Sequence, residues 1–253
     1  MLAEERRMQL AAWSQSEGRV DAVEASNRLK VAVETVRRDL EILQRRGVVR
    51  RVHGGAIPSE RFSKEANVSE RKSRNADAKR KIADAAARFI PSSGCIFVDG
   101  GSTTENLWRH LINKPNILVV TNNIQLASRI GESSTRMILL GGEVRPQSLS
   151  TTGNLAVEEL NKFHAQVAFI GVNGISDEAG LTTADLGEAV VKRVMIANAG
   201  ERILLADNSK FGSSFAAKFS TVSEFDRLVT DSGTPEDFLN TFRSSECDVV
   251  LAL

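Results

Sequence analysis

The apolar positions of the first fifty residues recur three and four apart, which is the spacing of one face of a helix. This pattern predicts helices over residues 3–16, 22–29 and 33–46. Residues 48–52 alternate as a strand does, and residues 53–55 make a glycine-rich turn. Three helices followed by a strand and a glycine-rich tip predict a winged helix-turn-helix.

Further along, the pattern changes to short aliphatic runs that alternate with helical patterns. The runs are residues 95–98, 117–120, 137–140, 167–170, 203–206, 228–230 and 249–251. Because they lack polar alternation, they fit strands covered on both faces and predict a Rossmann-like α/β domain with a mainly parallel sheet. A highly charged stretch separates the two patterns. The predicted divisions are 1–57 (winged helix-turn-helix), 58–80 (charged linker or connector helix) and 81–253 (α/β domain).

Charge is distributed unevenly along the chain, although the net charge is only +1. Residues 1–80 hold 18 Lys and Arg against 12 Asp and Glu, whereas residues 81–253 hold 15 against 20. A basic segment beside an acidic remainder predicts a polyanion partner for the first and a small-molecule or protein partner for the second. The sequence shows no targeting segment and no apolar run long enough for a bilayer, so we expect a cytoplasmic protein.

The third predicted helix carries the residue types that read DNA. At about 100° per residue, Thr35 and Arg38 lie roughly opposite the apolar stripe, and Arg37 lies on its flank. Such arginines suit the major groove, where a guanidinium can bind guanine or phosphates. The alternative is that they pair with acidic residues of the same helix on a solvated surface.

Polar residues also gather where predicted strands end. Asp99, Gly100, Gly101, Ser102, Thr103 and Thr104 follow the first strand of the second domain, where glycines admit a ligand and free amides suit a phosphate. Other strand-end candidates are Thr121, Asn122, Gly141, Gly142, Asn173, Asp207 and Lys210. Glu188 and Lys192 lie four apart on a predicted helix, either as a surface pair or as a polar pair facing the cleft. Ligands of open α/β sheets bind at this edge.

Residues 34–40 and 47–56 resemble the N-terminal signature of the DeoR family of bacterial regulators. Ala32 departs from it, because the family usually has a serine there that would cap the recognition helix. The resemblance implies that this helix and the wing contact DNA. The residues it assigns to the contact are Thr35, Arg37, Arg38, Arg50, Arg51, His53 and Gly54. His53 has an alternative role as a turn residue bonded to the local backbone.

The resemblance extends over essentially the whole chain, and residues 99–104 resemble the sugar-phosphate loop of that family. It implies a repressor of sugar uptake or metabolism genes that binds a double-stranded DNA operator as a homodimer or homotetramer. A phosphorylated sugar would release or modulate it. We expect neither a cofactor nor a metal.

The effector domain of the DeoR family is related in fold to ribose-5-phosphate isomerases and CoA transferases. The alternative function is therefore a sugar-phosphate isomerase with a DNA-binding appendage. Isomerisation needs a base near the sugar, and residues 171–174 contain no carboxylate where the related enzymes have acidic residues. Glu188 could still serve as a base. We expect a regulator that is not an enzyme.

Overall fold

The computed structural model describes residues 3–45, 49–58 and 65–253. The N-terminal domain has three helices and a three-stranded antiparallel sheet of order β1-β3-β2. Its elements are α1 (Ala3–Glu17), β1 (Val20–Asp21), α2 (Ala22–Leu29), α3 (Val33–Arg45), β2 (Val49–Val52) and β3 (Gly55–Pro58). This is the predicted winged helix-turn-helix. The residues expected to end the third helix, at 46 and 47, lie outside the described part of the chain.

The core and the turns of this domain follow from its sequence pattern. Leu10 of α1 packs with Val36 and Leu40 of α3, and all three are fully buried. The Asp21 side chain accepts hydrogen bonds from the first amides of α2, as an N-cap does. The wing requires glycine at position 55, because a Cβ there would lie 1.9 Å from the carbonyl oxygen of Val20.

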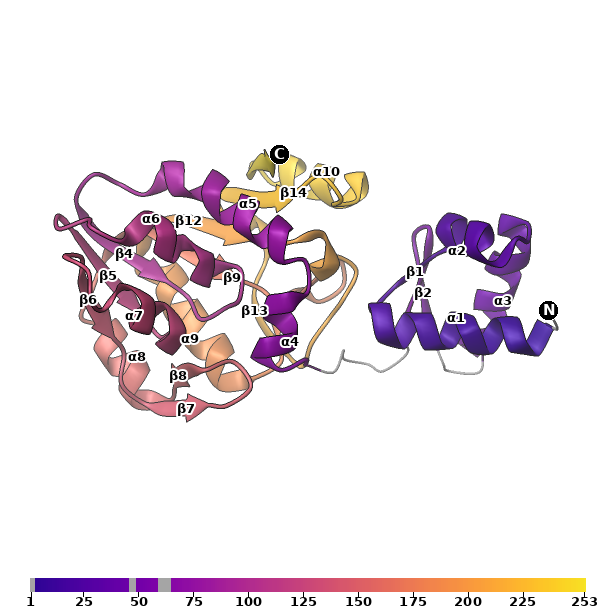
Figure 1. The fold of residues 1–253 in the computed structure, drawn as a ribbon, viewed down its shortest axis with the longest axis horizontal. Coiled ribbons are helices and arrows are strands. Elements are labelled where there is room, and N and C mark those ends of the chain that lie inside the picture. Colours follow the sequence, from indigo (N-terminus) through magenta and orange to yellow (C-terminus); the bar gives the residue numbers. More distant parts are fainter. Residues whose placement is uncertain (1–2, 46–48, 59–64) are drawn as a thin grey trace.

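The segment after the wing is helical where it is described. It contains α4 (Val68–Ser73), α5 (Ala76–Ala86) and the single turn η1 (Ala87–Phe89). We call residues 65–75 the connector. In Figure 1, α4 lies on the side of the α/β domain that faces the winged helix-turn-helix domain. Because α5 spans residue 80, the predicted division between linker and α/β domain falls within a helix. The division at 80 remains a prediction.

Seven strands form one parallel sheet of order β15-β14-β12-β9-β4-β5-β6, and each predicted aliphatic run lies on one of them to within one residue. The strands are β4 (Gly94–Val98), β5 (Ile117–Thr121), β6 (Arg136–Leu139), β9 (Ala165–Gly171), β12 (Ala199–Leu205), β14 (Arg227–Asp231) and β15 (Asp248–Ala252). The predicted fold class is confirmed.

Helices cover both faces of this sheet and produce three layers (Figure 1). One face is covered by α5, η2 (Thr104–Leu107), α6 (Trp108–Leu111) and α7 (Ile124–Ile130). The other is covered by α8 (Asn154–Leu160), α9 (Leu186–Ala197) and α10 (Glu236–Ser244). Ile96 and Val98 point to the first layer and Phe97 to the second, so both sides of β4 are apolar.

The direction in which strands are added reverses between β4 and β9, which are neighbours in the sheet. The chain segments that follow the carboxyl ends of β4 and β9 therefore leave the sheet toward opposite faces. Open α/β sheets bind ligands at such a switch point. Smaller elements that the sequence pattern did not predict lie around this edge. They are the hairpin β7 (Glu143–Arg145) and β8 (Ser150–Thr152), the sheet of β10 (Gly174–Ser176), β11 (Gly180–Thr183) and β13 (Ala217–Ser220), and the turn η3 (Asn208–Lys210). The turn η4 (Val222–Glu224) instead precedes β14, at the amino end of that strand.

Across the described ranges, no helix combines the length and the apolar character needed to cross a membrane.

Candidate functional site

Asp99, at the end of β4, turns inward rather than toward solvent. Its side chain is 2% exposed, and the carboxylate forms an ion pair with Lys192 of α9 and accepts a hydrogen bond from the amide of Gly171 at 3.0 Å. Lys192 also donates to the carbonyl oxygen of Gly171 at 3.0 Å. Burial raises the pKa of Asp99, and Lys192 opposes that rise. Asp99 therefore links β4 to β9 and α9 across the switch point. Its role is to hold these elements of the site together.

The glycine-rich loop that follows Asp99 passes close to the β7–β8 hairpin. The amide of Gly100 donates to the Asn122 side chain at 2.8 Å, and a Cβ on Gly100 would lie 2.8 Å from that of Ser150. Within the described residues, the amides of residues 101–103 have no hydrogen-bond acceptor. They are the free donors that the sequence predicted for an anion.

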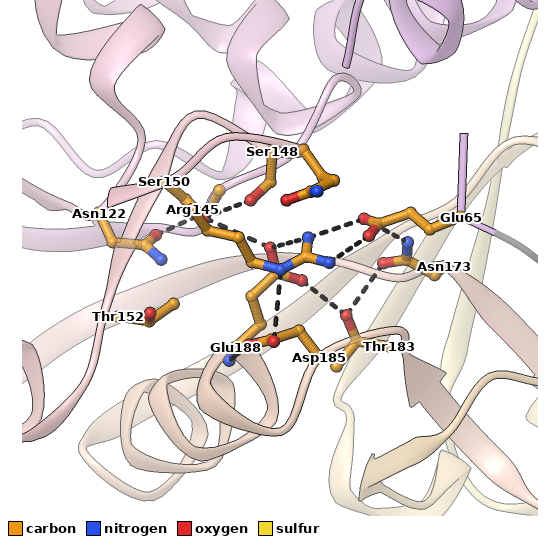
Figure 2. Close-up of polar contacts among 12 residues, drawn as sticks. Glu65, Asn122, Arg145, Ser148, Ser150, Thr152, Asn173, Thr183, Asp185 and Glu188 are labelled. Atoms are coloured by element: carbon orange, nitrogen blue, oxygen red, sulfur yellow. Dashed lines mark hydrogen bonds and ion pairs between the residues drawn. The ribbon is translucent and has the colours of Figure 1, made fainter. Parts of the chain in front are cut away.

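Arg145 of β7 lies at the centre of the polar side chains next to this loop (Figure 2). Its guanidinium lies between Glu65 of the connector on one side and Asp185 and Glu188 on the other. Arg145 Nη1 is 3.2 Å from Glu188 Oε1, and Nε is 3.4 Å from Asp185 Oδ2. Burial opposes the charge, but the hydrogen bonds to Glu65 and the charge of Glu188 raise the pKa of Arg145. The site therefore contains a permanent cation.

Glu188 is buried, as is Lys192, so the surface-pair interpretation is wrong for this helix. Its carboxylate accepts hydrogen bonds from the hydroxyls of Thr183 at 2.8 Å and Ser150 at 3.4 Å. Burial acts to raise the pKa of Glu188, but Lys192, Ser148 and Arg145 together lower it. Glu188 is thus held as a carboxylate.

Asn173 lies beside Glu188 and completes the polar wall at the end of β9. Its Oδ1 accepts from the Thr183 hydroxyl at 3.1 Å, and its Nδ2 is 3.4 Å from Glu65. The predicted candidates Asn122, Asn173, Glu188 and Lys192 and the loop of residues 99–104 therefore lie around one site.

Other candidates adjoin the site, but their polar groups serve the fold. The Thr121 hydroxyl donates to the carbonyl oxygen of Val98 at 2.5 Å, and the Thr104 hydroxyl donates to that of Asp99 at 2.7 Å. The Gly141 amide donates to Glu159 at 2.8 Å. Only glycine at position 142 allows the close approach of β8, because a Cβ there would lie 2.3 Å from the carbonyl oxygen of Thr152.

Asp207 and Lys210 lie apart from this group, against the connector. Asp207 accepts from the Asn75 side chain at 2.8 Å. Burial acts to raise the pKa of Asp207, but Lys210 and Lys79 lower it. Burial lowers the pKa of Lys210, and Asp207 opposes that change. The two clusters meet at the connector, where Arg71 Nη2 is 3.6 Å from Glu65.

Sequence reasoning missed several residues of this site, above all Arg145 and Glu65. Neither follows a strand of the parallel sheet, and Glu65 lies in the stretch expected to be a linker. The available signal was Ser148 and the hydroxyl residues 150–152, which follow Arg145 closely in the sequence. A strand made of Ser and Thr has no apolar pattern to reveal it.

On the DNA-reading helix α3, Arg37 and Arg38 are both exposed. Arg37 lies 3.4 Å from Glu34, an exposed pair that contributes little energy. Asp39 is buried and accepts from two arginines of α1 at 2.5 and 3.0 Å, so it is not a partner for its neighbours. Thr35 is half-buried in the first turn. The helix thus presents both arginines outward.

The wing residues have different surroundings. Arg51 donates to the carbonyl oxygen of Arg37 at 3.3 Å and so braces the wing against α3. Arg50 and His53 reach acidic side chains of the α/β domain, at 3.5 and 3.6 Å. Gly54 takes the positive φ of 78° that the turn requires. The DNA contacts assigned to these residues remain predictions.

Two family profiles match this chain. The sequence profile of the DeoR-like helix-turn-helix domain matches residues 6–61, and that of the DeoR C terminal sensor domain matches residues 74–232. The chain belongs to the DeoR family. It is accordingly a DNA-binding transcription regulator.

Relatives of this DeoR-family protein match along most of their length. The HTH-type transcriptional regulator GlpR of Haloferax volcanii is 32% identical over 98% of this chain and 97% of its own. The glycerol-3-phosphate regulon repressor of Escherichia coli K12 is 31% identical over 87% of each chain. The lactose phosphotransferase system repressor of Streptococcus mutans is 34% identical over 91% of this chain and 93% of its own.

Solved structures resemble this DeoR-family protein more distantly. Ribose 5 phosphate isomerase A from Neisseria gonorrhoeae is 16% identical over 53% of each chain, with a TM-score of 0.39. The translation initiation factor eIF-2B of Pyrococcus horikoshii is 14% identical over 85% of this chain and 74% of its own, with a TM-score of 0.42. Similarity at this level carries no argument about function.

Proposed function

We propose that this DeoR-family protein represses genes for the uptake or metabolism of a sugar or related polyol, and that its α/β domain binds a phosphorylated form of that compound. Relatives named as repressors of the glycerol-3-phosphate regulon and of a lactose phosphotransferase system support the class of gene. The site itself supports the class of ligand.

The observation that carries this proposal is the pairing of anion donors with hydroxyl acceptors at the switch point. Free amides at residues 101–103 and the guanidinium of Arg145 suit the oxygens of a phosphate. Glu188, held ionised, and the Asn173 side chain suit sugar hydroxyls. Such a set suits a small polar anion that also carries hydroxyl groups.

Effector binding regulates DNA binding only if it favours one arrangement of the linked domains. We propose that the protein acts in the cytoplasm as a homodimer or homotetramer that places two copies of α3 on repeated half-sites, as helix-turn-helix dimers do. The connector belongs to the part of the chain that joins the two domains. Its residues Glu65 and Arg71 also lie at the effector site, so a bound effector can act on the connector directly.

We propose binding without turnover. Aldose–ketose isomerisation needs a base that can take a proton, and the segment after β9 supplies Val172 and Asn173 but no carboxylate. Glu188 is the nearest candidate, and its carboxylate is engaged by Arg145 and Thr183. The isomerase alternative predicts measurable conversion of a sugar phosphate.

One experiment separates these functions. An operator would first be selected from the DNA upstream of the gene that encodes this protein. The complex with labelled operator would then be titrated with glycerol 3-phosphate, several hexose phosphates and their unphosphorylated counterparts. We expect one phosphorylated compound to bind by calorimetry and to lower the fluorescence anisotropy of the DNA. Release by the unphosphorylated sugars alone would refute the anion site. Chromatographic conversion of the bound compound above background would establish an enzyme.

A further inference from the structure

A carboxylate of the chain itself occupies the effector site. Glu65, from the connector, meets the Arg145 guanidinium through two hydrogen bonds, one of them 3.0 Å long from Nη1 (Figure 2). Its side chain is only 7% exposed. Fork-on-fork pairing is the geometry in which arginine binds a carboxylate or phosphate of a ligand.

The charges around Glu65 show that this position accepts an anion. Arg145 and Arg71 lie directly against its carboxylate, and Lys210 is close enough to be influenced by its charge. The buried Nε of Arg71 has no hydrogen-bond partner within the described residues. Arg145 would keep Asp185 and Glu188 without Glu65, but Arg71 would lose the carboxylate with which it pairs, and removing one partner of a buried ion pair is costly.

We propose that Glu65 is a tethered competitor for the anionic group of the effector. This rests on the proposed effector function, and it adds how the effector signals. The phosphate displaces Glu65 from Arg145 and Arg71, takes over their hydrogen bonds and frees the start of the connector.

The position of Glu65 in the chain couples that displacement to the DNA-binding domain. Glu65 lies two residues before Asn67, which caps α4 with a reciprocal hydrogen-bond pair. It lies seven residues after Pro58, where the last wing strand ends. A shift of Glu65 therefore moves the start of the connector, which follows the wing along the chain, without any need for a change in the sheet.

Competition of this kind has a measurable signature in affinity. A ligand that can bind only after Glu65 has left the site binds more weakly, by the inverse of the fraction of molecules in which the site is free. If the form with Glu65 bound to Arg145 is roughly ten times more populated than the form with Glu65 displaced, removal of Glu65 strengthens anion binding roughly tenfold.

The test uses the full chain, inorganic phosphate as the probe, and the substitution Glu65→Gln, which keeps the shape and removes the charge. Glu158→Gln is the matched control, because Glu158 is exposed on α8 and lies outside the site. Calorimetry is expected to give roughly tenfold tighter phosphate binding for Glu65→Gln and wild-type affinity for Glu158→Gln.

A second readout follows hydrogen exchange of the α4 amides, residues 68–73. Phosphate should speed their exchange in the wild-type protein, because the connector loses its anchor. Glu65→Gln should show the faster exchange without phosphate, and Glu158→Gln should not.

The outcomes distinguish the two proposals. Equal or weaker phosphate binding by Glu65→Gln, with binding still present, would overturn the competitor and leave the effector site standing. Phosphate binding that leaves α4 exchange unchanged would overturn the signalling step in the same way. If neither protein binds phosphate or any phosphorylated compound of the panel above, the effector site fails, and the competitor fails with it.

Discussion

Lys192 of α9 lies against the carboxylate of Asp99, 93 residues earlier in the chain, and both side chains are buried. Asp99 is therefore a support of the site and not a simple ligand contact. We expect Asp99→Ala to lower the free energy of unfolding of the α/β domain by about 3–5 kcal/mol, because it leaves a buried ammonium unpaired. Urea denaturation followed by Trp108 fluorescence in a Trp13→Phe background measures this.

A double variant separates the pair from its parts. Asp99→Ala combined with Lys192→Met removes both charges and should recover part of the lost stability. The exposed pair of Glu236 and Arg243 is the control, and its Glu236→Ala variant should cost less than about 1 kcal/mol. An Asp99→Ala protein as stable as wild type would contradict the buried pair.

The parallel sheet could be predicted because each of its strands contains a short run of aliphatic or β-branched residues. The β7–β8 hairpin could not, since Ser150–Thr152 is a strand of hydroxyl residues with no apolar face to mark it. The strand Gly180–Thr183 was missed for a similar reason. Hydrophobic pattern detects burial in a core, whereas the Ser150 and Thr183 hydroxyls of these strands donate to the buried carboxylate of Glu188.

The candidate site was predictable where it follows parallel strands and at the pair Glu188 and Lys192, which lie four apart on one helix. Asn122 and Asn173 come at strand ends, so topology alone places them at the switch point. Arg145 and Glu65 reach the site from a hairpin and from the connector, and no local spacing links two residues 80 positions apart. Their pairing is a tertiary contact that only the folded chain reveals.

Arg37→Ala should weaken operator binding by about 1–3 kcal/mol if the guanidinium reads a base, since it projects from α3 with only a weak pair to Glu34. Phosphate binding in the α/β domain should be unchanged. Fluorescence anisotropy on the selected operator measures the loss. Arg136→Ala, at an exposed arginine of β6, is the control. Unchanged operator affinity in Arg37→Ala would remove this residue from the DNA interface.

Asp39→Ala should loosen the winged helix-turn-helix domain rather than remove a DNA contact. Its carboxylate joins α3 to Arg6 and Arg7 of α1, which are mostly buried. We expect the opening free energy of α1 and α3 amides to fall by about 1–3 kcal/mol, less than for a fully buried pair because water reaches the arginines. Hydrogen exchange measures it, and Glu34→Ala on the exposed face should leave it unchanged. Normal protection in Asp39→Ala would show that the pairing is not stabilising.

Arg145→Lys should weaken binding of the phosphorylated effector by roughly tenfold to a hundredfold, because an ammonium keeps the charge and loses the planar pair of donors. Operator binding without effector should persist. Calorimetry with the effector found in the panel measures the change. Arg129→Lys, at a half-exposed arginine paired with Glu105, is the matched control and should bind as wild type does. Equal affinity in Arg145→Lys would place the phosphate elsewhere.

Lys79 gives the protein a distinctive dependence on pH. Its ammonium is buried where α4 meets α5 and donates to the carbonyl oxygens of Arg71 and Arg74. Burial lowers the pKa of Lys79 from 10.5 to about 8. Between these values the unfolded chain holds more protons than the folded one, so the contribution of Lys79 to stability rises with pH across that window.

The comparison that isolates this contribution is wild type against Lys79→Met. One pKa unit corresponds to about 1.4 kcal/mol. The free energy of unfolding of the wild type, relative to that of Lys79→Met, should therefore increase by up to about 3 kcal/mol as pH rises from below 8 to 10.5. Urea denaturation at a series of pH values measures the difference. Lys114→Met, at an exposed lysine, should show no such trend against wild type. A difference that stays flat, or that moves in favour of Lys79→Met at high pH, would mean that the folded chain does not penalise this charge.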